Sequence, residues 1–175
     1  LPGVFLPDAV MPTSDIADAL IDSDTVILAV PSGGVRQALV LLKDYLKPGM
    51  LIVHAGKGLE CETGLRGSQV ISEVLGDEVG RECVVLSGPN LAVELAKDIP
   101  TATVVASASV ENAVRAQTLF SSPSLRVYRS TDVAGVELGG ALKNVLAIGA
   151  GISDGLGYGD NTKATLITRG LVEMT

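Results

Sequence analysis

The sequence has 175 residues, enough for one ordinary domain and too few for two complete ones. Apolar residues make up 47% and charged residues 19%, which supplies material for a core and argues against a disordered chain. The net charge of −7, from 13 basic and 20 acidic residues, argues against a nucleic-acid or anionic-membrane surface built on a general basic excess. An anionic small molecule could still bind through a few local cations.

The cysteines and the apolar stretches bear on compartment. Cys61 and Cys83 lack CxxC spacing and His54 is the only histidine, so we expect no metal site and reduced cysteines that serve packing, as in a cytoplasmic protein. The longest apolar stretches, such as 25–30 and 145–150, are far shorter than the roughly 18 residues of a membrane span. We therefore expect no integral membrane contact, and no signal-peptide pattern opens the chain.

The first three quarters of the chain alternate helical and strand patterns. In chain order we predict a helix at 14–21, a strand at 25–30, a helix at 34–44, strands at 50–54 and 83–86 separated by a helix at 67–75, a helix at 89–97, a strand at 101–106, a helix at 110–120 and a strand at 125–129. Ser14 and Ser32 are the expected caps of the first two helices. The apolar run 25–30 predicts a strand buried on both faces. Such alternation is typical of βαβ units in a parallel sheet.

Only helices are predicted after residue 131, at 133–153 and from 161 or 162 to the end. We place a domain boundary there, with an α/β domain at 1–131 and the start of a helical domain at 132–175. The glycine-rich segment 155–159 follows a helix and no strand, which favours a helix-helix turn over a phosphate loop.

Three predicted strands end in unusual chemistry, at Pro31-Ser32, at Gly56-Lys57-Gly58 and at 87–90, the sequence Ser-Gly-Pro-Asn. Because the carboxyl ends of parallel strands share one edge of a sheet, where ligands bind, these segments should converge. Gly88 would let a ligand approach the backbone, and Lys57 could orient a phosphate or a hydroxyl. Each segment could also be a simple turn, and Lys57 a solvated surface lysine.

Lys143 is the strongest catalytic candidate. It lies in a small-residue, apolar helix, where burial would lower its pKa toward the range that suits general acid-base chemistry. A lysine snorkelling at a domain interface is the alternative. Asn144 lies about 100° around the helix from Lys143, and Glu137, nearly two turns earlier, could reach Lys143 only at a stretch.

The ordered motifs resemble those of NAD(P)-dependent glycerol-3-phosphate dehydrogenases. They are Ala29-Val-Pro-Ser32, Gly56-Lys-Gly58, Leu86-Ser-Gly-Pro-Asn90, Pro100-Thr101-Ala102, Asp132-Val-Ala-Gly-Val-Glu137, Gly140-Ala-Leu-Lys-Asn144, Gly155-Leu-Gly-Tyr-Gly-Asp-Asn161 and Thr168-Arg-Gly-Leu171. Single motifs are weak signals, but the order, centred on residues 140–144, is specific and spans nearly the whole chain.

The resemblance implies an α/β, Rossmann-like parallel sheet followed by the start of an all-helical substrate domain. It implies hydride transfer between sn-glycerol 3-phosphate and dihydroxyacetone phosphate with NAD or NADP, in the service of phospholipid synthesis. Lys143 would accept the proton of the C2 hydroxyl. The implied substrate contacts are Lys57, Gly88, Asn90 and Asn144, and the implied cofactor contacts are Lys57, Ala92 and Pro31.

The resemblance also implies that the chain is an internal fragment. The first βαβ unit with its glycine-rich loop should precede residue 1, and the segment that binds the substrate phosphate should follow residue 175. The isolated chain is then expected to show no measurable turnover and weak or no dinucleotide binding. NAD versus NADP preference stays open, as does monomer versus homodimer. The alternatives are another two-domain lysine-dependent dehydrogenase, of the ketopantoate reductase or hydroxyacid dehydrogenase type, and a non-catalytic dinucleotide-fold module.

Overall fold

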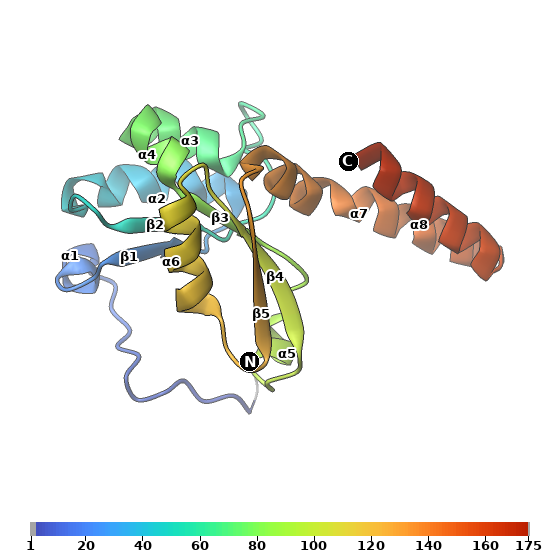
Figure 1. Cartoon of the computed structure of the whole chain (residues 1–175), viewed down its shortest axis with the longest axis horizontal. Helices are drawn as coiled ribbons and strands as arrows, with labels where there is room; N and C mark the ends of the chain where they lie inside the picture. Colours follow the sequence, from blue (N-terminus) through green and yellow to red (C-terminus); the bar gives the residue numbers. More distant parts are fainter. Residues whose placement is uncertain (1–2, 175) are drawn as a thin grey trace.

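The computed structural model describes residues 3–174, so the predicted domain ends at residues 1 and 175 lie outside the described residues. A five-stranded sheet forms its centre (Figure 1), with the strands side by side in chain order. The strands are β1 (Thr25–Leu28), β2 (Leu51–His54), β3 (Val84–Ser87), β4 (Thr101–Ala106) and β5 (Leu125–Ser130). Each matches a predicted strand to within two residues at either end.

The helices largely follow the prediction. They are α1 (Ile16–Leu20), α2 (Val35–Leu42), α3 (Gly67–Leu75), α4 (Asp77–Glu82), α5 (Ala92–Leu95), α6 (Val110–Phe120), α7 (Val133–Gly155) and α8 (Asp160–Met174), with 3-10 turns at Ser32–Gly34 and Lys43–Tyr45. The predicted caps are wrong. Asp15, and not Ser14, accepts the first amides of α1 at 2.7 and 3.3 Å, and Ser32 opens a 3-10 turn without a side-chain cap. The short helix α4 was not predicted.

An apolar layer covers part of each face of the sheet. On one face, α2 and α3 pack on β1 and β2 around a cluster formed by Val26, Leu28, Val35, Leu39, Leu42, Ile52, Val70, Ile71 and Cys83. On the other face, Ala116 of α6 packs on a cluster of Leu51, Val53, Val84, Val105 and Val127 from the four strands β2 to β5. Ile27 of β1 points to this second face beyond the cover of α6 and is 48% exposed. The prediction that this first strand is buried on both faces is therefore wrong.

The sheet is mostly parallel, with one reversal. β1, β2 and β3 run parallel, and so do β4 and β5, but β3 and β4 pair antiparallel, with Ser87 opposite Val104. The helix predicted at 89–97 shrinks to the four residues of α5, about 6 Å of helix. Such a segment does not carry the chain back along the sheet as a crossover helix would, so β4 returns in the opposite direction. The carboxyl ends of β1, β2 and β3 still share one edge.

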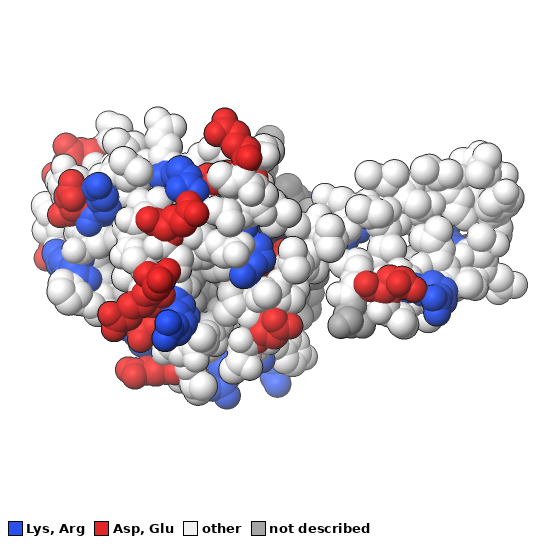
Figure 2. Space-filling view, turned by 90° about the horizontal axis from the view of Figure 1, so that it is seen from above, with Lys and Arg blue, Asp and Glu red and all other residues white. Residues whose placement is uncertain are grey.

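The chain ends in a helical hairpin, α7 and α8, that projects from the α/β body (Figure 1). The turn at 156–159 joins the two helices, as predicted, and a 2.7 Å ion pair of Lys163 with Asp154 links them. The helices touch closely where a Cβ on Gly170 would lie 2.0 Å from Leu146. From above, Figure 2 shows charged side chains spread over the α/β body and few on the hairpin.

The sequence predicted no segment long and apolar enough to span a membrane, but α7 meets that criterion. By length and composition alone its 23 residues could cross a membrane, although an uninterrupted apolar run of that length does not exist because Glu137 and Lys143 interrupt it. The first half of α7 packs on β3 and pairs with α3. Core helices of soluble proteins meet the same criterion, so α7 by itself is weak evidence for a membrane span.

The two cysteines are free and differ in environment. Cys83 is 2% exposed, its thiol donates to the Gly80 carbonyl at 3.1 Å, and burial raises the pKa of that thiol to about 12. The predicted packing role is confirmed for Cys83. It is wrong for Cys61, which lies exposed in the loop before α3.

Candidate functional site

The loops that follow β1, β2 and β3 meet at one edge of the sheet, as the strand ends predicted. A Cβ on Gly56 would lie 3.0 Å from the Val30 carbonyl oxygen, so the loops after β1 and β2 touch. Gly58, with φ +104°, faces the Ser32 side chain in the same way. The loop after β2 also reaches the one after β3 through Lys57.

Lys57 bridges two of these loops. Its Nζ donates to the carbonyl oxygen of Gly88 at 2.8 Å. Its pKa lies below the ordinary value, first because of partial burial and second because the positive charge of Lys143 is close. The two lysines that the sequence singled out therefore come together, although they are 86 positions apart in the chain.

A polar relay holds Asn90. The Thr103 hydroxyl, 3% exposed, donates to the Ser87 carbonyl at 2.9 Å, which leaves its oxygen to accept from Asn90 Nδ2 at 3.0 Å. This relay sets the orientation of the Asn90 amide. Asn90 Oδ1 is buried and has no hydrogen-bond partner among residues 3–174, so it can accept a hydrogen bond from a ligand beside the Lys57 loop. Sequence reasoning missed Thr103, because its link to Asn90 arises only from the reversal at β4.

Gly88 has a structural reason for lacking a side chain. A Cβ there would lie 2.8 Å from Thr103 Oγ1, 2.9 Å from Thr103 Cα and 3.1 Å from the Ala102 carbonyl. The packing of β4 against Gly88 thus requires a glycine at this position, whether or not a ligand also approaches its backbone.

α7 reaches this edge by crossing β3. A Cβ on Gly140 would lie 2.6 Å from Ser87 Oγ, so the helix backbone rests directly on the end of the strand. At about 100° per residue, Lys143 and Asn144 project about 60° and 40° to either side of Gly140, one turn farther along. Both residues therefore lie on the side of α7 that faces the strand ends, although they lie about 100° apart around the helix.

The expected burial of Lys143 is wrong. Its side chain is exposed, as is that of Asn144, because α7 leaves the α/β body after Gly140 and only α8 packs on its outer half. Pro31 lies exposed at the end of β1, near the Lys57 loop, and Ala92 lies exposed at the start of α5. The binding roles of all these residues stay predictions.

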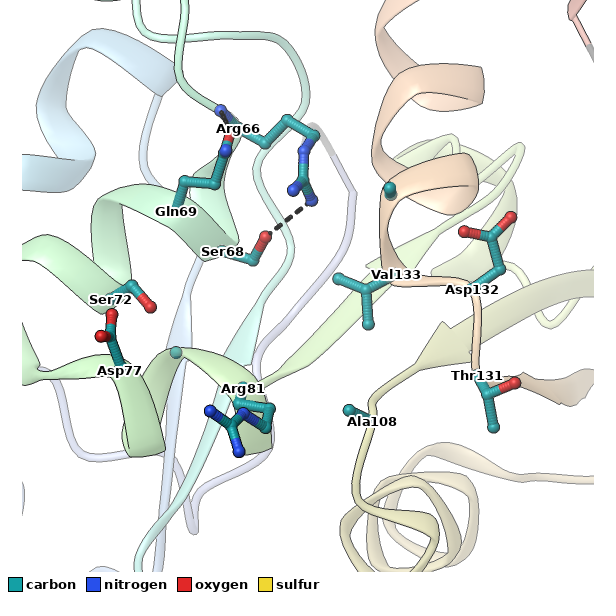
Figure 3. A pocket seen from close by; sticks show the side chains of 12 residues that line it. Arg66, Ser68, Gln69, Ser72, Asp77, Arg81, Ala108, Thr131, Asp132 and Val133 are labelled. Carbon is teal, nitrogen blue, oxygen red and sulfur yellow. Dashed lines mark hydrogen bonds between the residues drawn. The ribbon is translucent and has the colours of Figure 1, made fainter.

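Glu137 and its partners form a second cluster that the sequence did not reveal. Glu137, whose side chain is 6% exposed, accepts from the Ser68 amide at 2.8 Å, the Ser68 hydroxyl at 2.6 Å and Arg66 Nη1 at 2.5 Å. Arg66 and Ser68 line an open groove of about 460 Å³. Figure 3 shows them on one wall of the groove, and Asp132 and Val133, at the start of α7, on the other. The carboxylate thus pairs with α3, and not with Lys143.

His54 lies buried at the end of β2, 2% exposed, beneath this cluster. A Cβ on Gly67 would lie 2.2 Å from His54 Nε2 and one on Gly56 2.8 Å from Cε1, so two glycines make room for the ring. Its Nδ1 has no hydrogen-bond partner among the described residues. Burial lowers the pKa of His54 below 6.5, although the nearby Glu137 carboxylate acts in the opposite direction.

His54 should make the stability of the chain depend on pH. The folded chain holds the imidazole neutral, while the unfolded chain binds a proton below about pH 6.5. The free energy of unfolding should therefore have its highest value above pH 6.5 and decrease as the pH drops below it. Urea unfolding at pH 7.5, 6.5 and 5.5 measures this slope. The Arg36 side chain lowers the pKa of Glu60 to about 2, so the stability that this pair contributes is constant above about pH 4.5, is lost only below it, and does not interfere.

The matched variant is His54→Gln, which cannot titrate in this range. It should flatten the slope between pH 7.5 and 5.5 whatever its stability at pH 7.5. An unchanged slope in His54→Gln would assign the pH dependence to another group.

The mostly parallel sheet, with Lys57 and Lys143 close together at its strand ends, defines a Rossmann-like α/β protein joined to a helical second part. A model of the NAD-dependent glycerol-3-phosphate dehydrogenase N-terminus matches residues 1–113, and a model of the C-terminus of the same family matches residues 132–175. The chain belongs to the NAD-dependent glycerol-3-phosphate dehydrogenase family.

Curated relatives and solved structures agree with this membership. The NAD(P)+ glycerol-3-phosphate dehydrogenase of Syntrophomonas wolfei is 52% identical over 174 residues, which are 99% of this chain and 51% of that protein, and that of Geobacter sulfurreducens is 50% identical over 100% and 52%. The glycerol-3-phosphate dehydrogenase structure from Coxiella burnetii superposes with a TM-score of 0.87 at 34% identity, covering 99% of this chain and 52% of that one. The chain thus spans about half the length of the curated relatives it matches.

Proposed function

We propose that the protein to which this chain belongs interconverts sn-glycerol 3-phosphate and dihydroxyacetone phosphate by hydride transfer with NAD or NADP. The observation that carries the proposal is the approach of Lys143 to Lys57 at the carboxyl ends of β2 and β3, within a chain of this family. Two cations beside an open strand edge suit a small phosphorylated substrate, despite the net charge of −7.

In this proposal Lys143 moves the proton. As an ammonium it donates to the C2 oxygen during reduction of the ketone, and as a neutral amine it accepts the C2 hydroxyl proton during oxidation. Lys57, held on the Gly88 carbonyl, orients the substrate through its charge. Asn90 Oδ1, buried and without a partner among residues 3–174, would accept a hydrogen bond from a substrate hydroxyl, and Asn144 would contact the substrate from α7.

The residues present fit a nicotinamide dinucleotide at the same edge. A Cβ on Gly33 or Gly34, in the 3-10 turn after β1, would meet nothing within 4 Å, so a ligand has open access to this backbone. Pro31, Lys57 and Ala92 are the proposed cofactor contacts of this chain. When bound, the nicotinamide supplies the hydride or accepts it.

The wider setting is proposed with the reaction. We propose a cytoplasmic enzyme that supplies glycerol 3-phosphate for phospholipid synthesis. We also propose a division of the chain at residue 131, since the last described strand ends at Ser130 and α7 begins at Val133.

The test is an assay of the full-length protein for reduction of dihydroxyacetone phosphate with NADH and with NADPH. We expect turnover with at least one of them, and weak competition by carboxylated substrates such as ketopantoate. Absence of turnover with either cofactor, in a protein shown to be folded, would contradict the proposal.

A further inference from the structure

We propose that Glu137 is the positioning residue that sets where α7 presents Lys143 and Asn144 to the strand ends, an assignment that rests on the proposed function. Glu137 touches none of the proposed substrate or cofactor residues. Its three hydrogen-bond donors belong to the start of α3, the helix that follows the Lys57 loop in the chain. It therefore ties the helix that carries Lys143 to the part of the α/β body that carries Lys57.

The first half of α7 begins with a cap and then packs on β3 and β4 of the body. Asp132 caps the helix by accepting from the Gly135 amide at 2.8 Å. Glu137 pairs with Arg66 and Ser68 one turn later, and Gly140 rests on Ser87 in the following turn. Beyond Gly140 the helix packs mainly on α8, and its apolar residues Leu142, Val145, Ile148 and Ile152 are exposed.

Among these contacts, Glu137 is the one that can fix the rotation of α7. The cap at Asp132 lies within the helix start, and the contact of Gly140 with Ser87 sets how closely α7 approaches β3, so neither supplies a directional hydrogen bond from α7 to the body. The Glu137 carboxylate uses both oxygens: Oε1 accepts from the Ser68 amide, while Oε2 accepts from the Ser68 hydroxyl and Arg66. Two oxygens held by donors in different directions add geometric specificity and so favour one rotation of the helix.

Helix geometry carries this constraint to the site. Lys143 lies six residues beyond Glu137, about 9 Å along the axis, and Asn144 lies seven residues beyond, within about 20° of the same direction around the helix. A helix transmits a rotation rigidly over two turns. A change at Glu137 that rotates or lifts α7 would therefore move both side chains away from Lys57 and Asn90.

The first experiment reads the placement without any activity. In the 175-residue chain, lysines labelled with ¹³C at Cε are titrated by NMR, since the charge of Lys143 helps to hold the pKa of Lys57 low. Lys143→Gln identifies the change expected when that charge is removed, an upward move of the Lys57 titration. Glu137→Gln, which removes the anion and keeps the side-chain size, should move the Lys57 titration in the same direction.

The control is Glu60→Gln. Glu60 is another carboxylate paired with an arginine, Arg36, at 2.8 Å and 11% exposed, but within residues 3–174 neither residue forms a hydrogen bond or ion pair with α7. Its variant should leave the Lys57 titration in place. If Glu137→Gln does not fold, Ser68→Ala, which removes one donor and keeps the amide, should give a smaller shift in the same direction. A Lys57 titration that matches the wild type in folded Glu137→Gln, or in Ser68→Ala as its substitute, overturns the proposal.

The second experiment uses the full-length enzyme. Because a misplacement of about 1 Å can cost on the order of 100-fold in rate, Glu137→Gln should lower kcat by about 10- to 100-fold while the KM for NADH changes less than about threefold. Glu60→Gln should keep kcat within about twofold. Equal losses in both variants would mark a general effect of destabilisation and count against Glu137. If the wild type lacks the activity, the proposed function fails, and the NMR titration still decides the placement.

Discussion

Replacing Lys143 with alanine should lower kcat of the full-length enzyme by about 10²- to 10⁴-fold, the usual contribution of one general acid-base group. In the proposed reaction a proton must move to or from the C2 oxygen as the hydride moves, and Lys143 is the ionisable group that α7 presents at the strand ends beside Lys57. The measurement is steady-state oxidation of NADH with dihydroxyacetone phosphate, with kcat and KM determined separately.

Two comparisons make the Lys143 result specific. Lys43→Ala removes an exposed lysine from the 3-10 turn at Lys43–Tyr45, far from α7 in the chain, and should leave kcat within about twofold. Added ethylamine should restore part of the activity of Lys143→Ala, because a small amine can occupy the space of the lost side chain and move the same proton. Full turnover in Lys143→Ala would exclude the proposed catalytic role.

Replacing Gly140 with valine should push α7 away from β3. The new Cβ would lie 2.6 Å from Ser87 Oγ, and the branched side chain would extend into the same contact. We expect the free energy of unfolding to fall by about 1 to 3 kcal/mol, as for other overpacked contacts, and kcat to fall by about 10- to 100-fold because Lys143 and Asn144 move with the helix. Urea unfolding of the chain and the full-length assay measure the two effects.

Gly139 provides a matched control on the same helix. A Cβ there would meet nothing within 4 Å, and valine has the same helix propensity at both positions. Gly139→Val should therefore keep kcat within about twofold and leave the chain at least as stable as the wild type. Equal losses of activity in Gly139→Val and Gly140→Val would show that the contact with Ser87 does not position α7.

Local sequence signals predicted most of the elements. The apolar runs became β1 and β2, the face formed by Val35, Leu39 and Leu42 became the buried side of α2, and the glycines at 155–159 became the turn before α8. These features depend on nearest neighbours and on a periodic pattern, which a sequence displays directly. The meeting of the strand-end loops followed from the general rule for parallel strands.

Features that depend on distant segments were predicted poorly. The short connection through α5 reversed β4, and this reversal brought Thr103 to Asn90. Glu137 was weighed as a partner for Lys143 on its own helix, whereas its partners lie about 70 positions earlier. No pattern within the sequence of α7 indicates hydrogen-bond donors at the start of α3, so only the structure could reveal that Glu137 pairs with them.

The sequence alone determined the residue types at the site, their order and the family that they resemble, because each motif is a local arrangement of glycines, lysines and strand ends. Only the tertiary structure decided that Lys143 is exposed, that His54 is buried beside Glu137, and that Gly140 rests on Ser87. The physical reason is that burial, pairing and the rotation of a helix depend on which surfaces meet, and here those surfaces come from segments separated by 50 to 85 positions.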